Sequence, residues 1–374
     1  MVENGQDTRS ATAEVRDGLS RRPTMRDVAK RAGVSLKTVS RVVNQEPLVE
    51  QRTVAKVELA IEELRYRRDS LARNLRKGIR QLSIGLIIED LANPFYAHLA
   101  QAVEDAADSN AHSLILTSSR EDPERERTFV INLLQRGVEG LLIVPASHDH
   151  RYLSADLVRG VRVVFLDRSP KGIEADAVLS ENRAGARRAV EHLISFGHRR
   201  ICFLGDPMEL ETSADRFLGY KDALSTAGIE LDERLVSTRS STVQAAEQQT
   251  NELLKVRPAP TALFAQNNRH CIGALRALQA ADARLAVVGF DDFELATMLP
   301  TPVTVIANDA HEMGRQGAEL LFNRLAGVNG GPQRRLIPGR LIARGSGEIT
   351  ATEVEQSLAT QEDRAKYATT ETRT

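Results

Sequence analysis

Lys37, Arg41 and Asn44 could act together, because a helix through them would place all three side chains on one face. Lysine and arginine can donate hydrogen bonds to guanine O6 and N7, and asparagine can donate to a base or a phosphate. A surface helix with these donors is suited to reading DNA in the major groove. The alternative is an ordinary helical hairpin with a solvated polar face.

A second group of polar residues could bind a ligand, and two of its members follow apolar segments of the sequence. Asn267 comes shortly after Thr261–Phe264, Asp291 comes directly after Ala286–Phe290, and Arg216 lies elsewhere, in the segment SADRFLGY. If both segments are parallel strands, Asn267 and Asp291 lie at the sheet edge where open α/β sheets bind ligands. Carboxylate, amide and guanidinium groups together suit the hydroxyl and ring oxygens of a sugar. From the residues alone, helix capping by the first two and a surface ion pair for Arg216 are equally consistent.

Three short helices between residues 23 and 64 would position the first group. Thr24 begins a capping box before the first helix, and Gly33 ends that helix where a positive φ angle costs little. Ser35 is a good N-cap for the second helix, in which Val39 packs onto the first. A third amphipathic helix follows a turn, and its inward-facing residues are Val54, Val57, Ile61 and Leu64.

Charge is distributed unevenly along the chain, although the net charge is only −1. Residues 21–80 contain 16 Lys and Arg against 7 Asp and Glu, a balance of +9, which leaves −10 for the rest. A basic amino-terminal block on an acidic body indicates a polyanion-binding head. A solvated helical hairpin explains the apolar positions of this block but not its charge, so we favour DNA binding.

From residue 82 onward, short apolar runs alternate with helical stretches. The runs are continuously apolar, which is typical of buried strands in a parallel sheet built from right-handed βαβ units. About 260 residues of this pattern exceed one open sheet, so we expect two similar lobes. The runs are Leu82–Ile88, Ser113–Thr117, Gly140–Val144, Val161–Leu166, Arg200–Leu204, Thr261–Phe264 and Ala286–Phe290.

Composition and missing signatures exclude several classes of protein. The 374 residues, 41% of them hydrophobic, predict two or three compact domains and no general disorder. The sequence has no apolar run long enough for a membrane helix or a secretory signal, so we expect a cytoplasmic protein. Cys202 and Cys271 are solitary, and neither has partners at metal-ligand spacing. The usual catalytic and dinucleotide motifs are missing, so we expect neither an enzyme nor a cofactor.

The segment TMRDVAKRAGVSLKTVSRVVNQ, followed by VEQRTVAKVELAIEELRY and LARNLRKGIRQLSIGLI, closely resembles the lactose/galactose repressor family of bacterial transcription regulators. The resemblance covers roughly residues 23–347 and continues through Asn93-Pro94-Phe95, Phe165–Arg168, Gly197–Arg199 and Val288–Asp292. It implies a helix-turn-helix head, a hinge helix and a core like the periplasmic sugar-binding proteins. It also implies a homodimer bound to near-palindromic operator DNA.

Carried over by position, the resemblance assigns DNA-binding roles within the head. Leu36, Lys37 and Arg41 match the principal base-reading positions of the family. The remaining DNA-binding positions, most of them near phosphates, are Thr24, Ser35, Thr38, Ser40 and Asn44.

Ser70–Arg76 matches the hinge helix of the family, and Leu75 falls where the family inserts a leucine wedge into the minor groove. Partial unstacking of bases costs about a few kcal/mol and is offset by the contact surface that a bend exposes. The alternative for Leu75 is ordinary burial beside Leu71 at i,i+4. The residues before this segment, Arg67-Arg68-Asp69, replace the Pro-Asn that is usual in the family.

The same resemblance implies an effector cleft between the two lobes. The candidate residues of this cleft are Phe95, Arg168, Arg216, Asn267 and Asp291. Phe95 would supply an aromatic wall, and Arg168 would supply a further hydrogen-bond donor. Asn268 stands where the family commonly has an acidic residue, so it keeps an acceptor and loses a charge.

We therefore expect a small all-α helix-turn-helix head plus an α/β core of two lobes, each a parallel sheet flanked by helices. The expected function is a homodimeric repressor that binds double-stranded operator DNA and a small sugar-like effector, without a membrane partner. A stand-alone solute-binding protein leaves the basic head unexplained, and an enzyme on the same core is the weaker alternative. The expected parts are a disordered extension (1–22), a helix-turn-helix domain (23–68), a hinge helix and linker (69–80), an effector-binding and dimerisation core (81–347) and a polar disordered tail (348–374).

Overall fold

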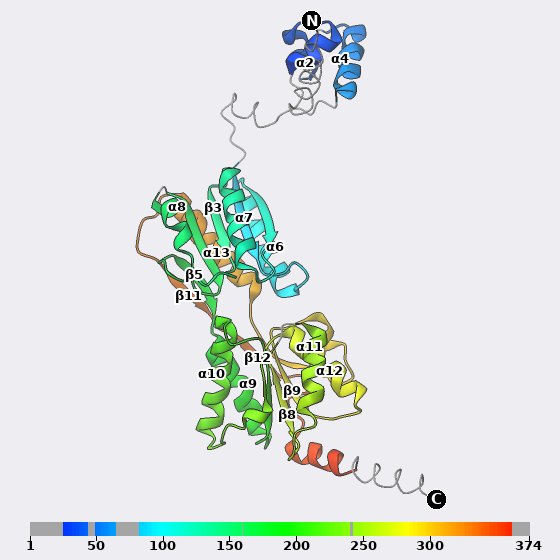
Figure 1. Ribbon diagram of the computed structural model, residues 1–374, viewed down its shortest axis with the longest axis vertical. Helices are drawn as coiled ribbons and strands as arrows, with labels where there is room; N and C mark the ends of the chain where they lie inside the picture. Colours follow the sequence, from blue (N-terminus) through cyan, green and yellow to red (C-terminus); the bar gives the residue numbers. More distant parts are fainter. Residues whose placement is uncertain (1–24, 44–48, 65–81, 159, 240–241, 361–374) are drawn as a thin grey trace, which may run out of the picture. The chain divides into compact units, whose positions relative to one another are not determined.

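The computed structural model of the chain divides into two compact units, Met1–Gln81 and Leu82–Thr374, each of which is described by itself (Figure 1). The predicted extension over residues 1–22 and the predicted hinge over 69–80 lie outside the described residues. The structure describes residues 25–43, 49–64, 82–158, 160–239 and 242–360.

Three helices form the described part of the first unit, as the sequence predicts. They are α2 (Met25–Ala32), α3 (Leu36–Val43) and α4 (Gln51–Glu63). Their apolar faces meet in a small core, where burial removes apolar surface from water. The buried side chains of this core are Val28, Ala29, Val39, Val57 and Ala60.

The turn between α2 and α3 follows the predicted chemistry. Gly33 has a φ angle of +68°, a left-handed conformation that glycine adopts without a steric penalty. The Ser35 hydroxyl accepts a hydrogen bond of 3.1 Å from the backbone N–H of Thr38, which caps α3. An ion pair of 2.7 Å between Arg31 and Glu63 links α2 to α4. Both predictions for this turn, the glycine and the serine cap, are confirmed.

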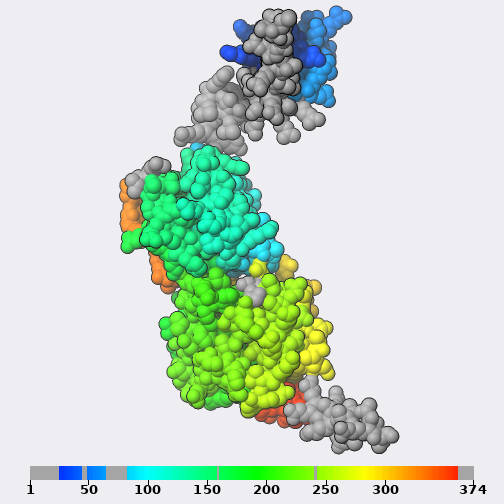
Figure 2. Space-filling view, viewed as in Figure 1, coloured from blue at the N-terminus to red at the C-terminus, as the bar shows by residue number. Residues whose placement is uncertain are grey.

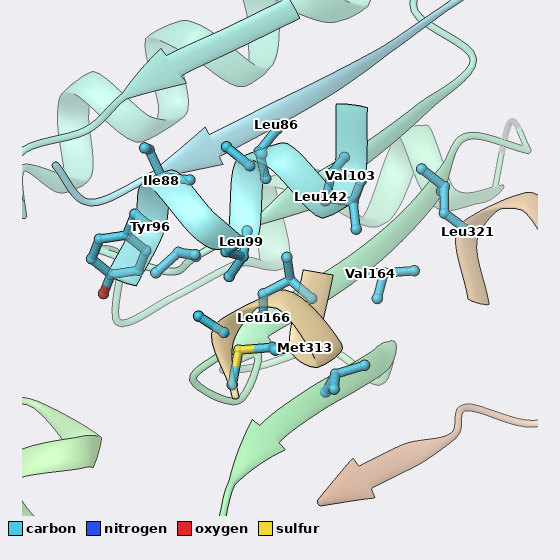
Figure 3. Close-up of a cluster of buried hydrophobic side chains, with 14 of the residues drawn as sticks. Leu86, Ile88, Tyr96, Leu99, Val103, Leu142, Val164, Leu166, Met313 and Leu321 are labelled. Atoms are coloured by element: carbon cyan, nitrogen blue, oxygen red, sulfur yellow. The ribbon is translucent and has the colours of Figure 1, made fainter. Parts of the chain in front are cut away.

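The first lobe of the second unit contains a six-stranded parallel sheet in the order β11-β5-β4-β3-β1-β2. Its strands are β1 (Ser83–Ile88), β2 (Ser113–Ser118), β3 (Gly140–Ile143), β4 (Arg162–Asp167), β5 (Asp176–Ser180) and β11 (Arg334–Ile337). Helices α6 (Pro94–Ser109) and α13 (Ala310–Leu325) cover one face of this sheet (Figure 3). Helix α7 (Pro123–Gln135) packs on the opposite face.

The second lobe repeats this arrangement in the order β12-β10-β9-β8-β6-β7, with β12 antiparallel to β10. Its strands are β6 (Ile201–Leu204), β7 (Val236–Ser237), β8 (Ala262–Ala265), β9 (Ala286–Phe290), β10 (Thr304–Ala307) and β12 (Arg340–Ile342). Helices α9 (Asn182–Ser195) and α10 (Glu211–Thr226) cover one face, and α11 (Val243–Leu253) and α12 (Asn268–Ala280) cover the other. Strands β4 and β9 therefore occupy equivalent positions in the two sheets.

The chain crosses between the lobes after β5, after β10 and after β11. The orange segment that contains α13 and β11 consequently lies against the first lobe in Figure 2, although the second lobe precedes it in the sequence. All seven strands predicted from apolar runs are present, each within about one residue of its predicted bounds. None of the helices in the described part of the chain has the length and apolarity needed to cross a bilayer.

The expectation of a disordered tail from residue 348 is wrong for residues 348–360, because residues 351–360 form a helix. Thr350 and Glu353 make a reciprocal capping box: the Glu353 carboxylate accepts from the Thr350 N–H (2.8 Å), and the Thr350 hydroxyl accepts from the Glu353 N–H (3.3 Å). Val354 is fully buried in the core of the second lobe, and Leu358 packs against the same core. These contacts stabilise a helix whose polar composition predicts disorder.

Val354→Ala is therefore expected to lower the free energy of unfolding by about 2 kcal/mol, because it removes two buried methyl groups and leaves a cavity. Gln356→Ala, at an exposed position of the same helix, is the matched control and should change stability by less than about 0.5 kcal/mol. Chemical denaturation of both variants measures the difference. Equal stabilities for the two variants would show that this helix does not pack on the lobe.

Candidate functional site

The exposed face of α3 carries the side chains predicted to read DNA. Leu36, Lys37 and Arg41 are exposed, with Leu36 exposed to 43%, while Val39 is fully buried in the helical core. The amino-terminal end of α3 thus presents an apolar side chain beside a cationic one at the surface. This surface is available to a partner because the apolar packing of the helix uses a different side.

The remaining predicted DNA-binding residues fall into two groups. Ser35 is exposed and caps α3, and Thr38 and Ser40 are half-buried on the same helix. The structure therefore brings together the six predicted residues that belong to α3 and its cap. Three others, namely Thr24, Asn44 and Leu75, lie outside the described residues.

In the core, Arg216 of α10 is only 5% exposed, so the surface ion pair that the sequence allowed is wrong. Its Nε donates to Asn182 Oδ1 (2.8 Å), and its Nη1 donates to the carbonyl oxygen of Gln266 (2.7 Å). The guanidinium lies over the Phe290 ring, 3.9 Å from the centroid, and Nη1 is 3.6 Å from Asp291 Oδ2. These contacts fix the planar group at the carboxyl ends of β8 and β9.

Asp291 follows β9 with a left-handed backbone of φ +65°, which aspartate tolerates better than most residues. Its Oδ1 accepts a hydrogen bond of 2.9 Å from Asn308 Nδ2. Burial raises the pKa of the Asp291 carboxyl to about 6, although Arg216 lowers it and Asp167 raises it further. Asp167 ends β4 with a matching φ of +66°, so equivalent aspartates of the two lobes influence each other electrostatically.

Asn267 caps α12 and also contacts a second carboxylate. Its Oδ1 accepts from the backbone N–H of His270 (2.9 Å), which confirms the helix capping that the sequence allowed. Its Nδ2 donates to Asp206 Oδ2 (2.8 Å) at the end of the neighbouring strand β6. The other oxygen, Asp206 Oδ1, is buried and has no hydrogen-bond partner among the described residues.

In the first lobe, Arg168 is buried against the strand ends. Its two terminal nitrogens donate to Glu121 over 2.8 and 2.5 Å, and Nη1 also donates to the carbonyl oxygen of Pro145 (2.9 Å). Arg120 and Glu121 have φ angles of +56° and +59°, which are strained for residues other than glycine. The fork-shaped ion pair therefore holds an unfavourable loop conformation in place.

The Tyr96 hydroxyl lies between two carboxylates, 2.9 Å from Glu89 Oε2 and 3.2 Å from Asp167 Oδ2. One hydroxyl has one proton, so it can donate fully to only one of them. Burial, followed by the charge of Glu121, raises the pKa of the Glu89 carboxyl to about 7. Glu89 therefore changes its protonation near neutral pH.

Polar contacts join the two lobes on this side. Arg269 of α12 pairs with Glu89 (3.3 Å) and with Asp90, both of which follow β1 in the first lobe. Asn268 Nδ2 donates to Asn93 Oδ1 over 2.9 Å. The carboxyl-terminal ends of the two sheets consequently face each other.

Phe95 packs edge-on against Tyr96, with ring centroids 5.1 Å apart. It lines a cavity of about 580 Å³ to which both lobes contribute, and Asn308 lies in the same lining. A cavity of this size accommodates a small organic ligand. Of the five predicted effector residues, Phe95 belongs to this lining, whereas Arg168, Arg216, Asn267 and Asp291 do not.

Sequence reasoning identified only part of this polar cluster. The structure brings Arg216, Asn267 and Asp291 together in the second lobe, and it places Phe95 and Arg168 in the first. Glu89 and Asp206 follow predicted strands, so the rule that singled out Asp291 would have found them. Asn308 follows β10, a strand that the apolar pattern did not reveal.

Comparisons with known proteins agree with this architecture. A family model described as "Bacterial regulatory proteins, lacI family" matches residues 24–69, and one described as "Periplasmic binding protein-like domain" matches residues 190–347. The ribose operon repressor of Escherichia coli (strain K12) is 31% identical over 329 residues, which cover 86% of this chain and 99% of that protein.

Two solved structures extend the comparison to three dimensions. The transcriptional regulator CelR in complex with cellobiose is 32% identical to this chain, with a TM-score of 0.65. The alignment covers 87% of this chain and 100% of that chain. The lac repressor dimer bound to operator and an anti-inducer is 29% identical to this chain, with a TM-score of 0.66. The alignment covers 88% of this chain and 100% of that chain.

A helix-turn-helix head and a two-lobed α/β core define a class of DNA-binding transcription regulators. The chain belongs to the lacI family of bacterial regulatory proteins.

Glu89→Gln is expected to stabilise the free protein at neutral and alkaline pH. The folded-state pKa of Glu89 is raised from 4.5 to about 7, so its contribution to stability is fully present below pH 4.5 and is lost as pH rises through 7. The variant should match the parent near pH 4.5 and exceed it above pH 7 by at most about 3 kcal/mol. Denaturation at several pH values measures this.

The matched control is Glu230→Gln, at an exposed position of the second lobe, which should show no such pH-dependent gain. A Glu89→Gln protein that is less stable than the parent above pH 7 would contradict the prediction. It would mean that the pairing with Arg168 and Arg269 outweighs the cost of burying the ionised carboxylate.

Proposed function

We propose that the chain is a homodimeric repressor that binds near-palindromic operator DNA and responds to a small sugar-like effector held between its lobes. The observation that carries this proposal is the presence, in one chain, of an exposed cationic α3 and a buried cluster of carboxylates, amides and guanidinium groups. The names of the relatives support both halves, because they include a ribose operon repressor, a regulator bound to cellobiose and a repressor dimer bound to operator.

For DNA, we assign Leu36, Lys37 and Arg41 to the bases of the major groove and residues 69–80 to a hinge helix. The exposure of Leu36, Lys37 and Arg41 supports their assignment, and phosphate neutralisation by the basic head would supply much of the affinity. Leu75 would act as a wedge in the minor groove. The remaining contacts, most of them to phosphates, would come from Thr24, Ser35, Thr38, Ser40 and Asn44.

For the effector, we assign binding to the facing strand ends of the two lobes. Donor and acceptor groups both lie there, which suits the hydroxyl groups of a sugar. The assigned residues are Phe95, Arg168, Arg216, Asn267 and Asp291. Glu89, Asp206 and Asn308 join this set because they contact its members directly.

The effector would act by changing the angle between the lobes, and through it the separation of the two hinge helices in the dimer. A ligand can shift DNA affinity only by its differential affinity for the two dimer states. We further propose that the protein catalyses no reaction and works in the cytoplasm, where its DNA target lies. The exposed polar head argues against a stand-alone solute-binding protein.

Arg41→Ala is expected to weaken binding to the specific operator by about 1–3 kcal/mol and to relax base preference, since it removes a bidentate donor. Lys56→Ala is the matched control, because it removes one charge from an exposed position of α4 instead of α3. Titration of operator and random duplexes at one salt concentration compares the two. Equal weakening of Arg41→Ala on both duplexes would make Arg41 a phosphate contact.

Asp291→Asn is expected to abolish the effector response while leaving effector-free operator binding intact. Asparagine keeps the acceptor for Asn308 and tolerates the left-handed backbone, but it lacks the second acceptor oxygen. Operator titrations with and without D-ribose or cellobiose, alongside melting temperatures, measure the response. Lost operator binding together with a lower melting temperature would make Asp291 a structural residue.

A further inference from the structure

Building on the proposed function, we propose that the effector is a hydroxyl-rich molecule that carries no phosphate or carboxylate. Two properties of the cleft lead to this chemical class: the side chains of Arg168, Arg216 and Arg269 are already paired with carboxylates, and the unsatisfied buried groups are mainly acceptors. Both properties depend on which side chains this chain has at the strand ends, and the arrangement of helices and strands alone does not determine them.

Four basic side chains at the facing strand ends are each paired with a carboxylate. Arg168 holds Glu121 through two hydrogen bonds and lies 3.4 Å from Glu89. An incoming phosphate would have to displace a carboxylate from each cation that it approaches, and like charges in a buried site cost several kcal/mol. The other pairs are Arg216 with Asp291 at 3.6 Å, Arg269 with Glu89 and Asp90, and Lys171 with Glu211 at 2.6 Å.

Buried acceptors at the same place lack donors. Asp206 Oδ1, Asn268 Oδ1 and Asn308 Oδ1 have no hydrogen-bond partner within the described part of the chain. Asp206 and Asn268 are 8% and 3% exposed, so water reaches them poorly. An unsatisfied buried acceptor costs free energy that a ligand proton would recover. Hydroxyl groups supply such protons, whereas an ionised phosphate supplies none.

The environment already disfavours further negative charge. Burial and neighbouring carboxylates raise the pKa of Glu89 to about 7 and the pKa of Asp291 to about 6. The negative charge of an anionic ligand would repel the ionised forms of both carboxyl groups. Such a ligand would therefore have to bind together with protons, which weakens its binding as pH rises.

At these strand ends, two buried donors of the described residues also lack hydrogen-bond partners, namely Arg168 Nε and Gln266 Nε2. Arg168 Nε offers one N–H and Gln266 Nε2 offers two, and such donors suit a ring or hydroxyl oxygen. Arg168 Nε is 3.8 Å from Asp167 Oδ2, so a charged oxygen bound there would lie close to a carboxylate. Arg168 Nε thus fits an uncharged oxygen better than an anionic one.

Isothermal titration of the full-length protein with matched pairs of sugars tests the inference. The pairs are D-ribose with D-ribose 5-phosphate and cellobiose with cellobionate. We expect a neutral sugar to bind and its anionic partner to bind at least about 100-fold more weakly. An anionic member that binds as tightly as its neutral partner would overturn the inference and leave the sugar effector standing. If no member binds, the sugar effector itself fails, and the inference fails with it.

A charge-removing variant tests the cause of the discrimination. Asp206→Asn keeps an acceptor for Asn267 and removes one negative charge, so it should reduce the neutral-to-anionic affinity ratio about tenfold, or about 1.4 kcal/mol. Glu230→Gln removes a charge at an exposed position and should leave the ratio unchanged. If Asp206→Asn does not fold, Glu89→Gln tests the same point from the other lobe. An unchanged ratio in the folded variant would overturn the electrostatic explanation.

Discussion

Charged side chains are buried where the two lobes meet, and the rest of the core depends on this constraint. Parallel strands of a sheet end at a common edge, so two facing sheets bring polar strand-end residues together. Removing a charge from water is costly unless a partner and hydrogen bonds compensate for it. Arg168, Arg216 and Arg269 each have a carboxylate partner, and this pairing allows a polar site to exist in a buried place.

The contacts between the lobes also differ in kind from the contacts within each lobe. The large apolar clusters belong to one lobe or the other, whereas the contacts between the lobes include ion pairs and amide hydrogen bonds such as Asn268 with Asn93. Polar contacts can be exchanged for water or ligand at a modest net cost, while separating packed apolar surfaces exposes them to water. The angle between the lobes can therefore change while both cores stay intact.

Sequence predicts the features that depend on local patterns and misses those that depend on distant parts of the chain. The strands that form the centres of both sheets are continuously apolar, and the turn at Gly33 has its own local chemistry. Strand β11 has the sequence RRLI and lies at a sheet edge, so its pairing with β5 arises only when the chain returns to the first lobe. Likewise, the contact between Asp206 and Asn267 requires β6 and β8 to be neighbours. The helix over residues 351–360 depends on both kinds of feature. Its capping box is formed by residues close together in the sequence, whereas its burial depends on contacts with the distant core of the second lobe.

Under the proposed function, Asn308 would link ligand binding to lobe movement. Asn308 lies in the crossover between β10 and α13, where the chain passes from the second lobe to the first, and it donates to Asp291. A ligand that satisfies Asn308 Oδ1 while contacting Asp206 and Arg168 would touch the crossover and both lobes at once. Its binding free energy must then vary with the angle between the lobes, which is the condition for shifting a conformational equilibrium. A ligand held by one lobe alone would bind both arrangements equally and would shift nothing.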